Sequence, residues 1–238
     1  SFLPTFYMFW KYSINPFVSM TAFIGLGFLQ YPMGILRQWL ALQFVLLAVD
    51  AYFKHKNIRV LFWIFVACLF HRTAILFLLI YIIHKIPNTF KAVEDAAVLG
   101  VVLVISEKFI FSLLNHFARI PMDQARNGGV TMLAVLWLIV LAVSFLNKGT
   151  IIDDNNEVFF KLVLIAATLQ PLSLSYSLWV RAIAYFSIFV CFLIPGVLNT
   201  NFANNTYSIL LKNIIIEGIM LAAFLIIGVP EFIFYNTI

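Results

Sequence analysis

Residues 57–85 read NIRVLFWIFVACLFHRTAILFLLIYIIHK, two apolar halves around a polar centre. Residues 58–69 and 74–83 are almost wholly apolar, and between them stand an imidazole and a guanidinium, His71 and Arg72. An ionisable side chain inside a membrane segment is costly and marks a functional site by default. We therefore expect the chemistry of this chain to lie near this break.

The composition is that of a membrane protein. The chain is 63% hydrophobic and 11% charged, with a mean hydropathy of +1.02, whereas a soluble domain carries about 25% charged residues. The net charge of +5 fits cytoplasmic loops and an anion site, so no nucleic-acid partner is expected. Cys68 and Cys191 lie in apolar runs and zinc-type spacing is absent, which predicts neither a disulfide, a metal site nor a cofactor.

The pattern of apolar segments predicts an all-α, polytopic transmembrane helical bundle of about eight or nine membrane helices in one domain over residues 1–238. As one helix, residues 58–84 would measure about 40 Å, which exceeds a hydrocarbon core of roughly 30 Å. We therefore expect a broken hairpin that turns back at residues 70–73. The other expected spans cover residues 17–33, 35–53, 97–114, 130–146, 158–175, 180–198 and 209–228.

This threading separates the basic residues by type. The positive-inside rule places the basic loop 54–59 in the cytoplasm, and lysines then gather on that side (Lys54, Lys56, Lys85, Lys91, Lys148, Lys161 and Lys212). Arginines other than Arg59 gather toward the outside (Arg37, Arg72, Arg119, Arg126 and Arg181). A guanidinium is a planar fork that grips phosphate or carboxylate, so these arginines predict an anionic ligand. The alternative is that each arginine only reaches the lipid headgroups.

Several short motifs, in their order and spacing, resemble the EpsG family. They are Arg37-Gln38-x-Leu40-Ala41 opening a span, Ala67-x-x-Phe70-His71-x-Thr73-Ala74, Arg181-x-x-x-Tyr185, Leu193-Ile194-Pro195, and Pro230 with Tyr235 after the last span. The resemblance implies a multi-pass polymerase of bacterial surface polysaccharides, including Wzy-type O-antigen polymerases. Family members usually begin with further spans, and this chain begins with Ser without a signal peptide, so we expect it to be the C-terminal portion of the pattern.

The resemblance also implies the reaction. A metal-independent glycosyltransferase at the outer face of the bacterial cytoplasmic (inner) membrane would move a growing chain from undecaprenyl diphosphate onto the next lipid-linked repeat unit. Its expected partners are the undecaprenyl-diphosphate-linked oligosaccharide and membrane lipids, with a chain-length regulator protein as a further candidate. The residues expected to bind the substrate and its diphosphate are Arg37, Gln38, Arg72, Arg119, Arg126, Arg181, Tyr185 and Tyr235. Arg37 and Arg181 are expected to face one outer cavity, with Tyr185 one turn below Arg181.

The acceptor hydroxyl needs a base. His71 is the first candidate because imidazole titrates near neutral pH, and Glu231, beyond the last span, is the second. The alternative for His71 is a helix-break residue bonded to the backbone. Asp50, near the cytoplasmic end of its span, is expected to be solvated or paired with a lysine.

Three other classes of protein compete with a polymerase. A flippase or transporter of lipid-linked oligosaccharides would also use outer arginines and a broken helix, but it should show internal repeats, and none is found. An intramembrane serine protease should show a Gly-x-Ser tripeptide near His71, which does not occur. An O-acyltransferase would draw its substrate from the cytoplasm, on the side away from the arginines.

Overall fold

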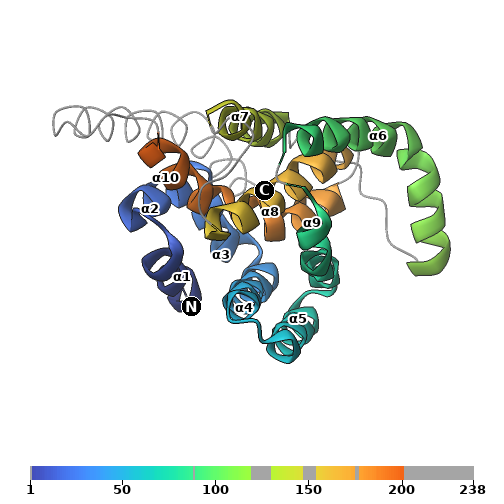
Figure 1. Cartoon of the computed structure of the whole chain (residues 1–238). Coiled ribbons are helices and arrows are strands. Elements are labelled where there is room, and N and C mark those ends of the chain that lie inside the picture. Colours follow the sequence, from blue (N-terminus) through green and yellow to red (C-terminus); the bar gives the residue numbers. More distant parts are fainter. Residues whose placement is uncertain (1, 88, 119–129, 147–153, 175–176, 201–238) are drawn as a thin grey trace. The chain divides into compact units, whose positions relative to one another are not determined.

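The computed structural model describes residues 2–87, 89–118, 130–146, 154–174 and 177–200. Within these residues all regular structure is helical (Figure 1), which confirms the predicted all-α class. The described residues form two compact units, 2–79 with 188–200 and 80–187. The prediction of one domain over residues 1–238 stays a prediction.

Two described stretches, Asn155–Leu174 and Trp179–Gly196, are long and apolar enough to cross a membrane, by length and composition. Shorter apolar helices cover Pro16–Gly25, Asn57–Phe70 and Val130–Phe145. These helices are consistent with a helical membrane protein, whereas the number of eight or nine spans stays a prediction. The expected span 209–228 lies outside the described residues.

An aromatic core holds the first unit together. Its elements are α1 (Leu3–Tyr12), α2 (Pro16–Gly25), η1 (Phe28–Gln30), α3 (Tyr31–Gly34), α4 (Leu36–Phe53), α5 (Asn57–Phe70), the start of η2 (Arg72–Lys85) and α10 (Val190–Thr200). Ring centroids lie 4.8 Å apart for Phe9–Phe192, 5.9 Å for Phe9–Phe23 and 5.9 Å for Phe23–Trp39. All four rings are buried, so contacts between tilted and edge-on aromatic rings join α1, α2, α4 and α10.

The first expected span, 17–33, is wrong as a single helix. Asn15 caps α2 by accepting hydrogen bonds from the backbone N–H groups of Phe17 and Val18. The helix then ends at Gly25, because Gly27 takes a φ of 79°, in the left-handed region that glycine enters without strain. Short turns η1 and α3 follow. The second expected span, 35–53, agrees with α4 to within one residue.

The break at 70–73 is confirmed, but the hairpin is not. α5 ends at Phe70, His71 is extended (φ −149°, ψ 113°), and η2 follows as a 3-10 helix. In η2 every third residue is buried, namely Ala74, Phe77, Ile80 and Ile83, as three residues per turn require. Over residues 57–85, all of which are described, α5 packs along α4 and not along η2. η2 therefore does not fold back along α5.

A proline in α10 explains one link within the first unit. Pro195 lies inside α10 and has no N–H, so the carbonyl of Cys191, one turn earlier, lacks its usual intrahelical donor. Ser19 Oγ on α2 donates to this carbonyl at 2.7 Å, and both residues are buried. A buried carbonyl needs such a partner, so the bond fastens α2 to α10.

The second unit is built around α8. It holds the end of η2 and α6 (Phe90–Ala118), α7 (Val130–Leu146), α8 (Asp154–Leu169), η3 (Gln170–Leu174) and α9 (Ser177–Ser187), and α8 packs on α6, α7 and α9. α6 approaches α8 closely at Gly100, where an added Cβ would lie 3.4 Å from the carbonyl oxygen of Thr168. Lys161, buried on α8, pairs with Glu157 one turn away.

The expected spans in and after this unit are only partly right. The span 130–146 agrees with α7, but α6 begins at Phe90 instead of residue 97, and α8 begins at Asp154 and continues into η3. The expected span 180–198 is interrupted between α9, which ends at Ser187, and α10, which begins at Val190. Polarity alone did not reveal that interruption because its residues are apolar.

Candidate functional site

The helical hairpin α4–α5 has two chemically different ends. The helices lie side by side (Figure 1) and are joined by residues 54–56. So short a link makes them antiparallel neighbours, which places the start of α4 beside the end of α5. Phe44 of α4 contacts Trp63 and Phe70 of α5, with ring centroids 5.8 and 5.3 Å away.

Three predicted site residues share the end away from the turn. At 1.5 Å per residue, Arg37 lies about 24 Å and His71 about 21 Å along the helices from the turn 54–56. Arg72 follows His71 directly. We call Arg37, His71 and Arg72 the arginine end of the hairpin. Both guanidinium residues are exposed, and within the described part of the chain neither forms an ion pair.

His71 is held by its own neighbours in the chain. Its N–H donates to the carbonyl of Ala67 at 2.9 Å, and its carbonyl accepts from the N–H of Ala74 at 3.0 Å. Its ring nitrogen Nδ1 lies 2.6 Å from Thr73 Oγ1. The half-buried imidazole therefore has a defined position at the helix break. The sequence interpretation did not identify Thr73 as a partner, although its hydroxyl two residues after the histidine was the available signal.

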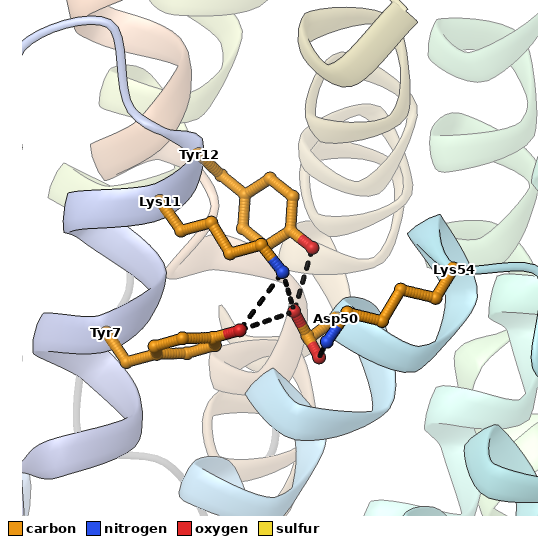
Figure 2. A network of polar contacts seen from close by, with 5 residues as sticks. All are labelled: Tyr7, Lys11, Tyr12, Asp50 and Lys54. Carbon is orange, nitrogen blue, oxygen red and sulfur yellow. Dashed lines mark hydrogen bonds and ion pairs between the residues drawn. The ribbon is translucent and has the colours of Figure 1, made fainter.

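At the other end, Asp50 is the centre of a polar network (Figure 2). Its Oδ1 accepts from Lys11 Nζ at 2.7 Å, Tyr12 OH at 2.8 Å and Tyr7 OH at 3.2 Å, and its Oδ2 accepts from Lys54 Nζ. We call these five residues the lysine end. The expected lysine partner of Asp50 is confirmed. Its three partners on α1 were not predicted; the i,i+4 spacing of Tyr7 and Lys11 was the signal available in the sequence.

Charge and aromatic rings together stabilise Lys11. Burial disfavours the ammonium, but hydrogen bonds to Asp50, Tyr7 and Tyr12 outweigh that effect and raise the pKa of Lys11 above its ordinary value. Its Nζ lies 4.8 Å from the ring centroid of Tyr12 and 5.3 Å from that of Tyr7, within cation–π range. Burial, with the bond to Asp50 acting in the same direction, raises the pKa of Tyr12 to about 12. The network thus keeps Lys11 charged and joins α1 to α4.

The other predicted site residues lie elsewhere. Gln38 is buried, so it faces the interior of the first unit. Arg181 is exposed and Tyr185 is buried one turn later on α9, in the second unit. Arg37 and Arg181 belong to different units, so their expected proximity stays a prediction. Arg119, Arg126, Glu231 and Tyr235 lie outside the described residues.

A second unforeseen contact lies in the core of the first unit. Gln43 Oε1 accepts from both the N–H and the hydroxyl of Thr5, at 3.2 and 2.9 Å, and both residues are buried. This bond joins α1 to α4 a second time.

Among the described residues, no group of three or more His, Cys, Asp or Glu side chains is arranged to hold a metal ion.

Comparison with known proteins agrees with the motifs. The family model described as EpsG family matches residues 1–237, essentially the whole chain. No curated protein and no solved structure matches it. Two of the motifs that carry the resemblance, Arg37-Gln38 and His71-x-Thr73, contain residues of the arginine end. The chain belongs to the EpsG family of Wzy-like polymerases, and is thus a membrane protein of the polysaccharide polymerase kind.

Proposed function

We propose that this chain is a glycosyltransferase that joins undecaprenyl-diphosphate-linked oligosaccharide repeat units at the outer face of the cytoplasmic membrane. One observation carries the proposal: two exposed guanidinium groups and an imidazole share one end of the α4–α5 hairpin, opposite the basic turn 54–56. The positive-inside rule assigns the basic turn to the cytoplasm. The arginine end would then face outward, where lipid-linked repeat units are joined.

The arginines suit the leaving group. When the glycosidic bond to the lipid diphosphate breaks, its electron pair stays on the phosphate oxygen and negative charge develops there. Guanidinium groups can grip phosphate oxygens in pairs of hydrogen bonds and stabilise that charge. Arg37 and Arg72 are assigned this role, since neither is neutralised by a carboxylate among the described residues. Arg119, Arg126 and Arg181, with Gln38, Tyr185 and Tyr235, remain further candidates for binding the substrate.

His71 is assigned the role of base. The acceptor hydroxyl oxygen forms the new bond to the anomeric carbon while the bond to the diphosphate oxygen breaks, and the hydroxyl proton passes to the imidazole. The ring sits at the break between α5 and η2, next to Arg72. The candidate proton acceptor and the candidate anion binder are therefore neighbours in the chain. Glu231, outside the described residues, is the second candidate for the base.

Purified protein with lipid-linked repeat units tests this proposal, read as a ladder of products on a gel. His71→Ala and His71→Gln should both lose the ladder while still binding the lipid-linked substrate, because glutamine can hydrogen-bond but cannot take up a proton. His55→Asn is the matched control: it removes an exposed imidazole at the turn, where φ is 53° and asparagine fits. This variant should polymerise normally.

Two outcomes would contradict the proposal. A normal ladder from His71→Gln would show that His71 positions the chain or the substrate, and that the proton goes elsewhere. Wild-type protein that makes no ladder but carries labelled lipid-linked oligosaccharide across the bilayer of a vesicle would be a flippase. Both measurements use the full chain in the same lipid preparation, so a difference reports on the activity and not on the environment.

A further inference from the structure

Two buried N–H groups on α4 have no hydrogen-bond acceptor among the described residues. They are the indole Nε1–H of Trp39 and the amide Nε2 of Gln43, whose residues are only 1% and 4% exposed. The two residues are four apart on α4, so they are neighbours on one face of the helix. Folded proteins rarely leave a buried donor without an acceptor, and a bound water or ion is a usual reason where they do.

Both side chains reach the first turn of α1. The ring of Trp39 contacts the ring of Phe2, the residue before α1, with centroids 5.0 Å apart. Gln43 Oε1 accepts from the N–H and the hydroxyl of Thr5, at 3.2 and 2.9 Å. The N–H of Thr5 belongs to the first turn of α1, whose N–H groups have no partner within the helix. Gln43 therefore caps α1 from α4, and Trp39 packs beside that cap.

The bonds to Thr5 also determine which hydrogen-bonding groups remain. Gln43 Oε1 meets two donors, and the opposite assignment of the amide would set its NH2 group against the N–H of Thr5. Both lone pairs of Oε1 are therefore used, and the two protons of Nε2 remain. Thr5 Oγ1 gives its own proton to Gln43, and its lone pairs accept from no donor among the described residues. The contact of α1 with α4 thus offers N–H donors and a hydroxyl acceptor, all of them buried.

We propose that this contact binds one water molecule, which accepts hydrogen bonds from Trp39 Nε1–H and Gln43 Nε2–H and donates one to Thr5 Oγ1. Water supplies two lone pairs and two protons, and about three hydrogen bonds are usual for a buried water. An anion suits the two donors, but it has no proton for Thr5, and none of these three side chains carries a charge to balance it. The inference concerns the packing of the first unit and does not depend on the proposed reaction.

NMR of the full chain in lipid nanodiscs tests for this water. Nitrogen-15 in the tryptophan indoles and glutamine amides reports on both donors, and their signals are identified by their absence in Trp39→Phe and Gln43→Met. In the wild type, both N–H groups should show a nuclear Overhauser cross-peak to water. The Trp39 indole proton should nevertheless exchange slowly with D2O, because the site is buried and only the bound water lies close to it.

The double variant Thr5→Val with Gln43→Met removes two of the three partners of the water. One partner is fewer than the two to four that a buried water needs, so the Trp39 cross-peak should be lost while the indole proton still exchanges slowly. Thr5→Ser, the matched control, keeps the hydroxyl and should keep the cross-peak. The wild-type measurement alone decides if the double variant does not fold. Absence of the cross-peak from either donor in the wild type, or its survival in the folded double variant, would overturn the proposal.

Discussion

Each end of the α4–α5 hairpin has two lysine or arginine side chains, but the groups around these side chains differ. At the lysine end, the Asp50 carboxylate accepts hydrogen bonds from the ammonium groups of Lys11 and Lys54 and from two tyrosine hydroxyls. At the arginine end, Arg37 and Arg72 are exposed and, within the described residues, have no carboxylate partner. Compensated cations stabilise a fold, whereas uncompensated cations remain available to an anionic ligand.

The difference also separates stability from function. The lysine end bridges α1 and α4 with hydrogen bonds over 38 to 43 residues of chain, so its loss should loosen the first unit. The arginine end is built from the start of α4 and the chain after α5, and its cations hold no element in place by an ion pair among the described residues. Variants at the two ends should therefore fail in different assays.

The proposed roles of the two ends require that they lie on opposite sides of the membrane. In a chain without Cys68 and Cys191, Leu36→Cys reports on the arginine end and His55→Cys on the lysine end; both positions are exposed. A membrane-impermeant maleimide added to intact cells should label Leu36→Cys only. His55→Cys should react only after the membrane is permeabilised. Equal labelling from outside would show that α4 does not cross the bilayer.

Removing a cation from the arginine end and one from the turn 54–56 should have very unequal effects on turnover. Arg37→Ala should lower polymerisation by about a hundredfold, the scale of losing one preorganised group that stabilises developing charge. Arg37→Lys should remain poor because lysine lacks the planar fork. Lys56→Ala, which removes an exposed cation at the turn, should be nearly normal. Full activity of Arg37→Lys would reduce the role of Arg37 to charge steering.

Asp50→Asn should act on stability instead. Hydrogen bonds to charged groups contribute about 1.5–3 kcal/mol, but the side chains of Lys11 and Lys54 are 34% and 41% exposed. Solvent screening reduces the loss to about 1–2 kcal/mol. Thermal unfolding in detergent should show a lower Tm, while the turnover of each folded molecule is unchanged.

Asp95→Asn is the control for this substitution. Asp95 is an exposed carboxylate on α6 that forms no ion pair with a described residue, so its loss should leave the Tm unchanged. An equal fall in Tm for the two variants would mean that net charge, and not the network of Asp50, stabilises the protein. Loss of turnover in folded Asp50→Asn would break the separation between the two ends.

The sequence was informative where one local feature decides the structure. Polar His71 and Arg72 between apolar runs predicted the break, and the run before Lys54 predicted α4 to within one residue. The sequence was uninformative where contacts between residues distant in the chain determine the structure. Nothing local showed that α5 would pack on α4 and not on η2, or that Lys11 would form a hydrogen bond with Asp50. The arginine end itself was predictable because its residues flank helix ends.

The smallest expected effect on stability concerns the hydrogen bond between α2 and α10, which involves no residue of the arginine end or the lysine end. Ser19→Ala removes the donor to the Cys191 carbonyl and leaves that buried oxygen without its partner. An unsatisfied buried group costs about 1–3 kcal/mol, and we expect the lower part of this range because the backbone can relax. Chemical unfolding followed by tryptophan fluorescence measures the loss, and turnover should not change.

A second substitution shows whether the proline is the reason. In Pro195→Ala, residue 195 regains an N–H that can donate to the Cys191 carbonyl within α10, so Ser19→Ala should cost much less in that background than in the wild type. Ser144→Ala is the matched control: Ser144 Oγ also donates to a carbonyl, that of Val140, but there the helix supplies its own N–H donor. The control should therefore be milder than Ser19→Ala. If Ser19→Ala lowers the free energy of unfolding equally with and without Pro195, the missing N–H of the proline is not the reason for the bond. Ser19 would then stabilise α2 through its contact with Ser13.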